Sequence, residues 1–451
     1  MSLKGKLEEY SKSNIYPFHM PGHKRMLDDP YKIDLTEVEG VDNLHHPEGI
    51  IADEQKRIAR IYNAKESLML VGGSTVGNLA AIYAACSEGD TIIIQRNSHK
   101  SVYNGAIVRH LNVEYINPKW DENGIFHGVT VEMVTEAIKK YSPKAIVLTT
   151  PSYEGYHCNI EEISKIAHEN GVILIVDQAH GAHLGFHPDF KHSAVGYADI
   201  TIQSLHKTLP CLTQTGVLHI SGDLVDGYKI KEALEIFETS SPSYVLMDSI
   251  SGCLDYLESK EDIFADYVDK LDDFYKISGQ HTHLEIITES DDIKDKGKIV
   301  ISTRNSGITG VELAEILREK YQIETELSSF SYVLAMTSIM DTKEGFDRLK
   351  LALTEMDRTL SEEKIELPAI TFESTKVMEP FEAKNKDRES IRFTEATGRI
   401  STVMVCLYPP GVPVIVPGEE IKEQNIKLIK EAVEKNIQVT GLISGTISVV
   451  K

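Results

Sequence analysis

Apolar positions in the first two thirds of the chain fall into two alternating kinds of segment. Short, unbroken apolar runs are typical of buried strands, and segments of ten to fifteen residues with a helical period separate them from about residue 64 onward. The strand-like runs are TIIIQ, NVEYI, AIVLTT, VILIVD, DITIQS and GVLHIS. Apolar strands separated by helices predict a largely parallel sheet covered on both faces, so the expected fold class is α/β.

The pattern changes after about residue 275, where fewer strands and two long helical segments predict a smaller α+β unit. Near the C-terminus, the prolines and glycines of YPPGVPVIVPGEE predict a fixed loop in place of a regular element. The first residues are a polar lead-in without a helix or strand pattern. The expected regions are a lead-in (1–35), a large domain (36–275), a small α+β domain (276–365) and a C-terminal domain (366–451).

Composition narrows the class of protein. Of the 451 residues, 41% are apolar, so a large core is available. The formal net charge of −22 argues against a nucleic-acid partner, which needs a basic surface. The charge would favour the approach of a cationic small molecule, and simple solubility is the alternative explanation. No apolar run reaches the ~18 residues of a membrane span, and MSLKGKLEEY lacks the apolar part of a signal peptide. The five cysteines form no CxxC pair, so we expect a reducing, cytoplasmic location.

Two charged residues stand where predicted strands end. Lys207 follows the run DITIQS in the segment SLHKTLP, and a lysine amine held in a pocket can attack a carbonyl to form a Schiff base. Asp177 ends the run VILIVD and needs a partner at the exit of a buried strand. A pyridinium N–H, a metal or a helix N-terminus would serve, and a capped structural aspartate is the alternative.

A glycine-rich turn and a histidine lie in similar positions. GGSTVGN precedes a predicted helix, and Ser74 and Thr75 at its N-cap and first turn would suit a phosphate, although an ordinary helix cap explains them equally well. The spacing is not that of a P-loop. His99 follows the strand TIIIQ by a short link and could pack flat on a planar ring, the alternative being a surface histidine.

One cofactor gives all of these residues a role, and one rival hypothesis remains. With pyridoxal 5′-phosphate on Lys207, Asp177 would keep the ring nitrogen protonated and His99 would cover the ring face. The phosphate would contact Ser74, Thr75, Ser204 and His206. The rival is a metal site formed by Asp177, His180, His183 and His187. The histidine spacing is HxxH without the glutamate of HExxH, so we expect no metal.

Eight ordered segments resemble the Orn/Lys/Arg decarboxylase family, whose members are pyridoxal-phosphate enzymes of the aspartate-aminotransferase fold, fold type I. The resemblance runs from about residue 16 to about residue 420. The segments are PFHMPGHK, LTEVEGVDNLHHPEGII, GGSTVGN, RNSHKSVYNGA, PSYEGYHCNI, VDQAHGAH, SLHKTLPCLTQTG and YPPGVPVIVPGEE. It implies that Lys207 is the Schiff-base lysine, Asp177 the ring-nitrogen partner and His99 the stacking residue. It also implies a position for Ala179 on the other ring face and for His180 near the phenolic oxygen. The remaining implied cofactor contacts are Ser74, Thr75, Val76, Ser204 and His206.

The resemblance also implies a homodimer, or a higher homo-oligomer, with the active site at the subunit interface. Residues 43–49 (NLHHPEG) and the Pro/Gly segment around Tyr408 are expected near that site. The signature begins almost at the N-terminus, so the chain resembles the short form of Gram-positive bacteria and we expect it to lack the N-terminal domain that supports decamers.

The expected activity is pyridoxal-phosphate-dependent decarboxylation of arginine or lysine, less favourably ornithine, to the amine and CO2, in polyamine biosynthesis. Glu395 in RFTEATGRI is the candidate partner of the substrate's distal cation. A surface glutamate paired with Arg392 or Arg399 is the alternative, and Glu154 or the neighbouring subunit could supply the carboxylate instead. Transamination or aldol cleavage on the same cofactor, a metal-dependent hydrolase and a catalytically idle regulatory homologue remain open.

Overall fold

The computed structural model describes residues 2–13, 20, 21, 24, 26, 28–260, 262–367, 375–408 and 411–451. The chain divides into two compact units, each assembled from separate stretches of sequence. The first unit contains residues 1–87, 144–150 and 159–265, and the second contains residues 88–143, 151–158 and 266–451. Most of the segment PFHMPGHK lies outside the described residues, as do Pro409 and Pro410.

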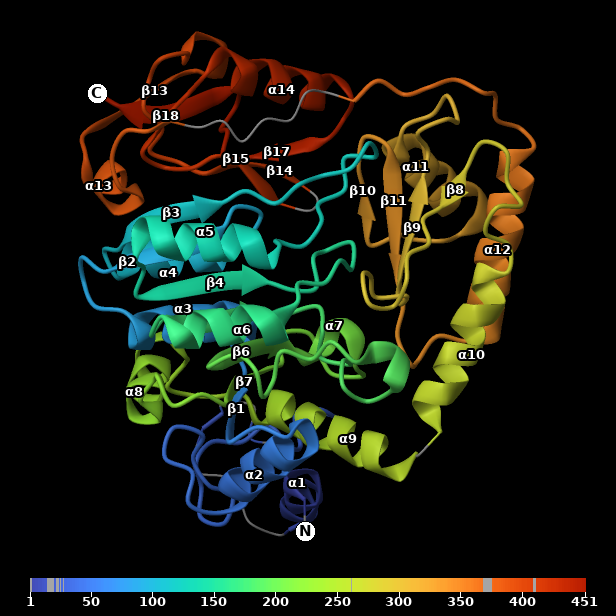
Figure 1. Ribbon diagram of the computed structural model, residues 1–451. Helices are drawn as coiled ribbons and strands as arrows, with labels where there is room; N and C mark the ends of the chain where they lie inside the picture. Colours follow the sequence, from blue (N-terminus) through green and yellow to red (C-terminus); the bar gives the residue numbers. More distant parts are fainter. Residues whose placement is uncertain are drawn as a thin grey trace. The chain divides into compact units, whose positions relative to one another are not determined.

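In the first unit, five strands follow one another in the order β1-β7-β6-β5-β4 (Figure 1). They are β1 (Glu66–Leu70), β4 (Ala145–Thr149), β5 (Ile173–Asp177), β6 (Ile200–Ser204) and β7 (Gly216–Ile220). The pairings β4–β5 and β5–β6 are parallel, which agrees with the α/β expectation. Strand β7 instead runs antiparallel to both β6 and β1. A hydrophobic run carries no information about strand direction, and β1 had not been identified from the sequence.

The helices of the first unit are α1 (Leu3–Ser11), α2 (Ile50–Tyr62), α3 (Gly73–Ala85), α6 (Ile160–Glu169), α7 (Leu205–Thr208), α8 (Gly227–Phe237) and α9 (Tyr244–Ser259), with a 3-10 turn at Pro188–Phe190. Helix α3 packs across β1, β7, β6 and β5. Helix α1 corrects the expectation of a lead-in without helix. Its residues Leu3, Leu7 and Tyr10 are buried along one face, which packs on α9, and Ser2 caps its N-terminus.

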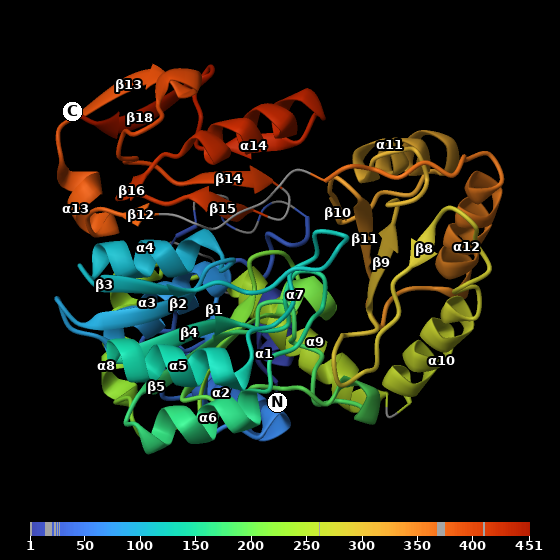
Figure 2. The ribbon, with the colours of Figure 1, turned by 45° about the horizontal axis from the view of Figure 1, so that its top comes forward.

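The second unit contains the parallel strands β2 (Thr91–Gln95) and β3 (Asn112–Ile116) with helices α4 (Lys100–Val108) and α5 (Val131–Tyr141). A separate four-stranded sheet has the order β10-β11-β9-β8. Its strands are β8 (Glu285–Ile286), β9 (Lys298–Ser302), β10 (Leu327–Ser328) and β11 (Tyr332–Met336). Helices α11 (Gly310–Tyr321) and α12 (Lys343–Asp357) lie beside this sheet, as expected for two long helical segments (Figure 2). Helix α10 (Ile263–Tyr275) begins in the first unit and ends in the second.

The C-terminal part of the second unit has its own apolar core, formed where α14 (Glu423–Glu434) packs on a three-stranded sheet. The sheet order is β15-β14-β17, from β14 (Val405–Tyr408), β15 (Val412–Ile415) and β17 (Gln438–Thr440). The other elements are β12 (Thr375–Lys376), α13 (Pro380–Asn385), β13 (Arg388–Arg392), a 3-10 turn (Phe393–Glu395), β16 (Glu419–Glu420) and β18 (Thr446–Val450).

The expectation of an irregular loop at YPPGVPVIVPGEE is wrong for residues 412–415. These residues form β15, which pairs antiparallel with β14 and places Cys406 opposite Pro413. A proline lacks the N–H of a ladder hydrogen bond, but β15 is the edge strand, where one face of the backbone needs no strand partner. The side chain of Tyr408 lies outside what the structure describes.

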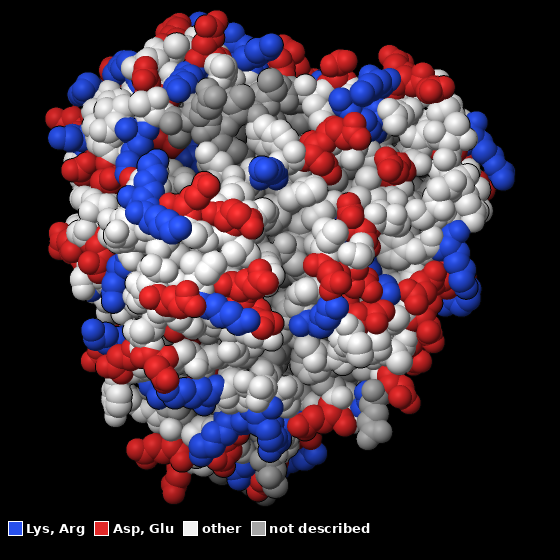
Figure 3. All heavy atoms as spheres, viewed as in Figure 1, with Lys and Arg blue, Asp and Glu red and all other residues white. Residues whose placement is uncertain are grey.

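The distribution of charged side chains and the hydropathy of the helices can be compared with what the sequence predicts. Acidic and basic side chains are interspersed over the face drawn in Figure 3. Among the described residues, no helix is both long enough and apolar enough to cross a bilayer.

Candidate active site

Lys207 and His180 come together at the ends of two adjacent parallel strands of the first unit. Lys207 lies in α7, which directly follows β6, and His180 lies in the turn after β5. The Nζ atom of Lys207 is 2.9 Å from Nε2 of His180. The hydrogen bond can form with an ammonium donating to a bare Nε2, or with Nε2–H donating to a free amine. The pair can therefore exchange a proton without moving apart.

Asp177 is the last residue of β5 and is only 2% exposed. Its Oδ2 accepts a hydrogen bond from Nδ2 of Asn78 in α3 at 2.8 Å, and its Oδ1 accepts one from the backbone N–H of Ala179 at 3.1 Å. Both donors are neutral. A carboxylate has about four lone-pair sites, so it retains capacity for a further N–H or cationic partner.

The N-terminal end of α3 lies beside the end of β6. The N-cap is Gly72 without a side-chain hydrogen bond, which corrects the expected N-cap position of Ser74: Ser74 and Thr75 lie within the first turn. The Oγ atoms of Ser74 and Ser204 are 2.5 Å apart. The backbones of β6 and β7 approach closely beside these hydroxyls: a Cβ atom added at Gly216 would lie 2.9 Å from the carbonyl oxygen of Gln203. Two hydroxyls thus converge at a helix N-terminus, where anions are favoured.

The other expected cofactor residues of this unit are Val76 and Ala179, which are both buried, and His206. Nδ1 of His206 is 2.8 Å from the carbonyl oxygen of Thr215, and because a carbonyl only accepts, Nδ1 carries the proton. Burial, with a smaller effect of the nearby Lys207 charge, lowers the pKa of His206. The neutral ring then presents a lone pair at Nε2. A phosphate contact there requires protonation, which an adjacent dianion would favour.

The histidines of the rival metal hypothesis have other partners. His183 packs edge-on against Phe190, with ring centroids 5.0 Å apart. Nδ1 of His187 accepts the backbone N–H of Asp189 at 3.2 Å. In the part of the chain that the structure describes, no three His, Cys, Asp or Glu side chains gather as a metal-ligand set.

His99 and Glu395 belong to the second unit. His99 is the exposed N-cap of α4, and its Nδ1 accepts the backbone N–H of Ser101 at 3.3 Å. Glu395 is exposed in the 3-10 turn Phe393–Glu395. The expected alternative pairing with Arg399 is not formed, because Arg399 pairs with Glu389 at 2.6 Å.

Glu154, the other carboxylate considered for the substrate's distal cation, is buried in the second unit. Its Oε1 accepts from the hydroxyl of Tyr332 at 2.7 Å and its Oε2 from Ser152 at 3.1 Å. Burial raises the pKa of Glu154. Because Glu154 is buried and its burial favours the neutral carboxyl, it is a weaker candidate than an exposed carboxylate for binding a substrate cation.

The segment NLHHPEG (43–49) is held by a residue that sequence reasoning missed. The carboxylate of Asp42 accepts backbone N–H groups from Asn43, Glu48, Gly49, Ile51 and Ala52. Burial opposes ionisation of Asp42, but these donors outweigh it and lower its pKa. The charged side chain therefore fixes the loop and the start of α2 together.

A second missed feature is a buried ion pair in the second unit. The Nη1 and Nη2 atoms of Arg96 donate to Oε1 and Oε2 of Glu419 at 2.5 and 2.9 Å. Each residue is 1% exposed, and Oε2 also accepts the backbone N–H of Val416 at 2.8 Å. Arg96 begins the turn that leads to His99, so this pair joins that turn to the end of the Pro/Gly segment. The two residues are 323 positions apart in sequence, which explains why no local pattern reveals the pair.

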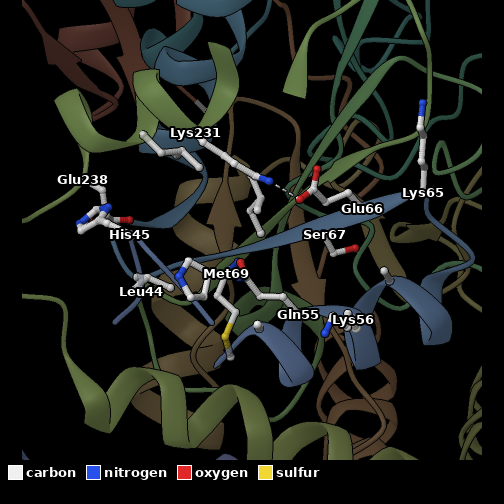
Figure 4. Close-up of a pocket in the computed structure, with 15 residues that line it drawn as sticks. Leu44, His45, Gln55, Lys56, Lys65, Glu66, Ser67, Met69, Lys231 and Glu238 are labelled. Carbon is white, nitrogen blue, oxygen red and sulfur yellow. Dashed lines mark hydrogen bonds and ion pairs between the residues drawn. The ribbon is translucent and has the colours of Figure 1, made fainter. Parts of the chain in front are cut away.

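A cavity of about 520 Å³ lies beside the edge strand β1 (Figure 4). Its lining residues come from α2, β1, α8 and the loop before α2, and Lys231 pairs with Glu66 at 2.6 Å on its wall. Oε1 of Gln55 accepts the backbone N–H of Met69, and Oε2 of Glu238 accepts that of Val71. These side chains cap edge N–H groups of β1 and its continuation. None of the expected cofactor residues lines this cavity.

Comparison with known proteins identifies, along most of the chain, the family that the sequence motifs resemble. The family model described as the Orn/Lys/Arg decarboxylase major domain matches residues 2–296, and that of the C-terminal domain matches residues 362–441. The arginine decarboxylase of Bacillus subtilis (strain 168) is 31% identical over 99% of this chain and 96% of its own length.

Solved structures confirm the expected fold. A lysine decarboxylase from Francisella novicida has a TM-score of 0.84 at 21% identity, covering all of this chain and 81% of that one. An alanine–glyoxylate aminotransferase from Nostoc sp. has a TM-score of 0.53 at 17% identity, covering 68% of this chain and 86% of that one. The fold is therefore fold type I, and the chain belongs to the Orn/Lys/Arg decarboxylase family.

Proposed function

We propose that this protein is a pyridoxal 5′-phosphate-dependent decarboxylase that converts a basic amino acid to the corresponding amine and CO2. One observation carries the proposal: Lys207, which follows β6, is hydrogen-bonded to His180, which follows the neighbouring strand β5, and β5 itself ends in the buried carboxylate of Asp177. Arginine is the first candidate substrate, because the Bacillus subtilis relative is named an arginine decarboxylase. Lysine is the second.

The residues of the first unit fit the cofactor. Asp177 has two neutral donors and room for a third, which suits a protonated ring nitrogen. The paired hydroxyls of Ser74 and Ser204 and the first turn of α3 suit a phosphate. Lys207 supplies the amine, and the residue two positions after Asp177 is the small Ala179. We keep His99, which belongs to the second unit, as the residue proposed to stack on the cofactor ring.

Each protein group then has a definite task. When bound, pyridoxal phosphate supplies a sink for the electron pair that CO2 leaves behind. Lys207 would hold the cofactor through its Nζ atom. His180 accepts a proton from Nζ, or returns one, through Nε2. The negative charge of Asp177 keeps a proton on the ring nitrogen, because a nearby carboxylate favours the charged form of a base.

The distal cation of the substrate requires a carboxylate, and we keep Glu395 as the candidate. It is exposed and carries no hydrogen bond or ion pair among the described residues, so its charge is available to an incoming guanidinium or ammonium. The excess of acidic residues, 69 against 47 basic ones, favours approach of a cationic substrate in general.

Product analysis tests the activity directly. The purified protein, incubated with pyridoxal phosphate and with arginine, lysine or ornithine in turn, should release CO2 and the matching amine from at least one of them. Formation of a keto acid, or of an aldehyde fragment, without CO2 would instead establish transamination or aldol cleavage. Zinc-dependent turnover by colourless protein that lacks the cofactor would overturn the proposal entirely.

A homodimer in the cytoplasm completes the proposal. The family resemblance supports the dimer, and the lack of CxxC pairs supports the location; the loop 43–49, expected near the subunit interface, is held by Asp42 and exposes His46. Light scattering on the purified protein should give twice the chain mass of 50.4 kDa or a higher multiple. A monomer with full activity would contradict this part of the proposal.

A further inference from the structure

The side-chain amide of Gln203 bridges the two strands that end at the candidate active site. Gln203 lies in β6, one residue before Ser204, and is completely buried. Its Nε2 donates to Oε1 of Gln178 at 2.9 Å and to the carbonyl oxygen of Gly181 at 3.3 Å. Both acceptors belong to the segment that follows β5. The side-chain amide of Gln203 therefore donates two hydrogen bonds to the segment that follows the neighbouring strand β5.

These acceptors are the two ends of one turn. The backbone N–H of Gly181 donates to the carbonyl oxygen of Gln178 at 2.9 Å, so residues 178–181 form a β-turn. His180 occupies its third position and Ala179 its second. The ladder between β5 and β6 ends where Asp177 pairs with Ile202. Beyond that point, Gln203 continues the connection with its side chain.

The amide orientation of Gln203 follows from the groups around it. His219, also completely buried, has Nε2 at 3.1 Å from Oε1 of Gln203, and an amide oxygen only accepts, so Nε2 carries the proton. Nδ1 of His219 is then bare and accepts the hydroxyl of Ser67 at 2.8 Å. Burial lowers the pKa of His219 to about 3, which keeps the ring neutral. The chain of donors runs in one direction from Ser67 to the turn.

The far side of the turn is also anchored. The hydroxyl of Tyr62 donates to the carbonyl oxygen of Ala182 at 2.9 Å, and the Tyr62 ring lies 4.7 Å from that of His219. Oε1 of Gln178 accepts a second hydrogen bond, from the backbone N–H of Ala194 at 3.1 Å. Gln203, Ala194 and Tyr62 are all buried, and these contacts restrict the freedom of the turn and of the residue that follows it.

The main chain of Gln203 leads directly to the lysine. Ser204 ends β6, and Lys207 follows within the single-turn helix α7. The same residue thus contacts the His180 turn through its side chain and lies in the strand that leads to Lys207. From this arrangement we propose that Gln203 is a positioning residue that sets His180 against the amine of Lys207. The inference rests on the proposed role of Lys207.

The first test measures the reactivity of Lys207 in the cofactor-free protein. Limited acetylation at one pH, followed by peptide mass spectrometry, gives the modification of Lys207 relative to the exposed Lys229. Gln203→Met keeps the length of the side chain but removes both donors. We expect the ratio to change roughly threefold or more, in the same direction as in His180→Gln, because the hydrogen bond between Nε2 of His180 and Nζ helps to set the protonation and nucleophilicity of the amine.

Ser67→Ala is the matched control. It removes one buried hydrogen bond at the other end of the same donor chain and leaves both donors of Gln203 in place. It should lower the melting temperature without changing the Lys207 ratio. If Gln203→Met fails to fold, Gln203→Glu replaces it, because a buried, protonated glutamate still accepts from His219 but offers only one donor to the turn.

Kinetics on the loaded enzyme give a second readout. In Gln203→Met we expect kcat to fall about tenfold or more with KM changed less than about twofold, since misplacement of a proton-transfer group affects the chemical step. An unchanged Lys207 ratio in Gln203→Met, or an equal change in Ser67→Ala, would overturn the positioning role. The wild-type enzyme tests the proposed function separately: if borohydride leaves no cofactor label on Lys207, that function fails whatever Gln203 does.

Discussion

The amine of Lys207 and the imidazole of His180 lie 2.9 Å apart although 27 residues separate them in the chain. Parallel strands β5 and β6 bring them together, because both residues follow the C-terminal end of their strand. Asp177 ends β5 at the same edge. An amine, a base and a buried carboxylate at one sheet edge are the basis of the predictions for Lys207 and Asp177.

Lys207 should carry the cofactor. Borohydride treatment of the loaded enzyme should fix a phosphopyridoxyl group on this residue, because its amine lies within reach of a base and follows a buried strand. Tryptic peptide mapping checks the position. Lys207→Ala should retain weak cofactor binding through the Ser74 and Ser204 region while turnover is lost. A label on any other lysine would refute the assignment.

Asp177→Asn should lower kcat by a factor of about 10²–10³, the size typical of a lost electrostatic contact to a reacting group. The substitution preserves shape and removes the charge that keeps the ring nitrogen protonated. Steady-state kinetics and the absorbance spectrum measure the effect. Asp199→Asn is the control, since Asp199 is a buried carboxylate of the same unit that binds His168 at 3.0 Å. Equal losses in both variants would mean that Asp177 is only structural.

Glu395→Gln should raise KM for the basic substrate by about 30-fold or more, close to the lower end of the cost of leaving a charged group without its partner. The value of kcat should change less, because the contact to the distal cation exists in the ground and transition states alike. Glu389→Gln serves as the comparison, as Glu389 is another exposed carboxylate of the C-terminal region. A normal KM would move the specificity carboxylate elsewhere.

Glu419→Gln should destabilise the protein by about 3–5 kcal/mol, because it leaves the buried guanidinium of Arg96 without a counter-charge. Burial disfavours the charge of Arg96, yet Glu419 outweighs it and raises the pKa of Arg96. The double variant Arg96→Met, Glu419→Met should recover part of this loss, since apolar residues of similar size need no partner. Urea denaturation measures both, and equal stability of the wild type and Glu419→Gln would show that the pair contributes little.

His219 should make the folded state sensitive to acid. Burial lowers the pKa of His219 in the folded protein from 6.5 to about 3. Between these two pH values the unfolded chain is protonated at His219 and the folded protein is not. The penalty is absent above pH 6.5 and grows as the pH falls toward 3. Between pH 7 and pH 5 the wild type should lose about 2 kcal/mol more than His219→Asn. Parallel loss in the two proteins would contradict the buried neutral state.

Local signals in the sequence were enough to identify the site residues as candidates. Largely apolar runs located six strands, because burial on both faces of a sheet favours apolar side chains at most positions. The segments around Lys207 and Asp177 stood out since charged residues rarely follow such runs without a partner. Family resemblance then supplied the cofactor, and the roles of individual site residues stay predictions.

Strand direction and several elements were decided only by the tertiary structure. The edge strand β1, the antiparallel β7 and the strand containing Pro413 depend on which neighbour each segment meets. Helix α1 was missed because its three buried residues stand in an otherwise polar segment, and only packing on α9 makes them a core.

The sequence by itself determined the order of elements, the family and the residues able to do chemistry, because periodicity and motifs are properties of neighbouring positions. Tertiary structure alone decided which distant polar groups meet. The pairing of Arg96 with Glu419, and of Gln203 with the turn at Gln178 and Gly181, joins residues whose spacing follows no local period. Burial makes each of these partners necessary, since a polar group removed from water must find its hydrogen bond inside the fold.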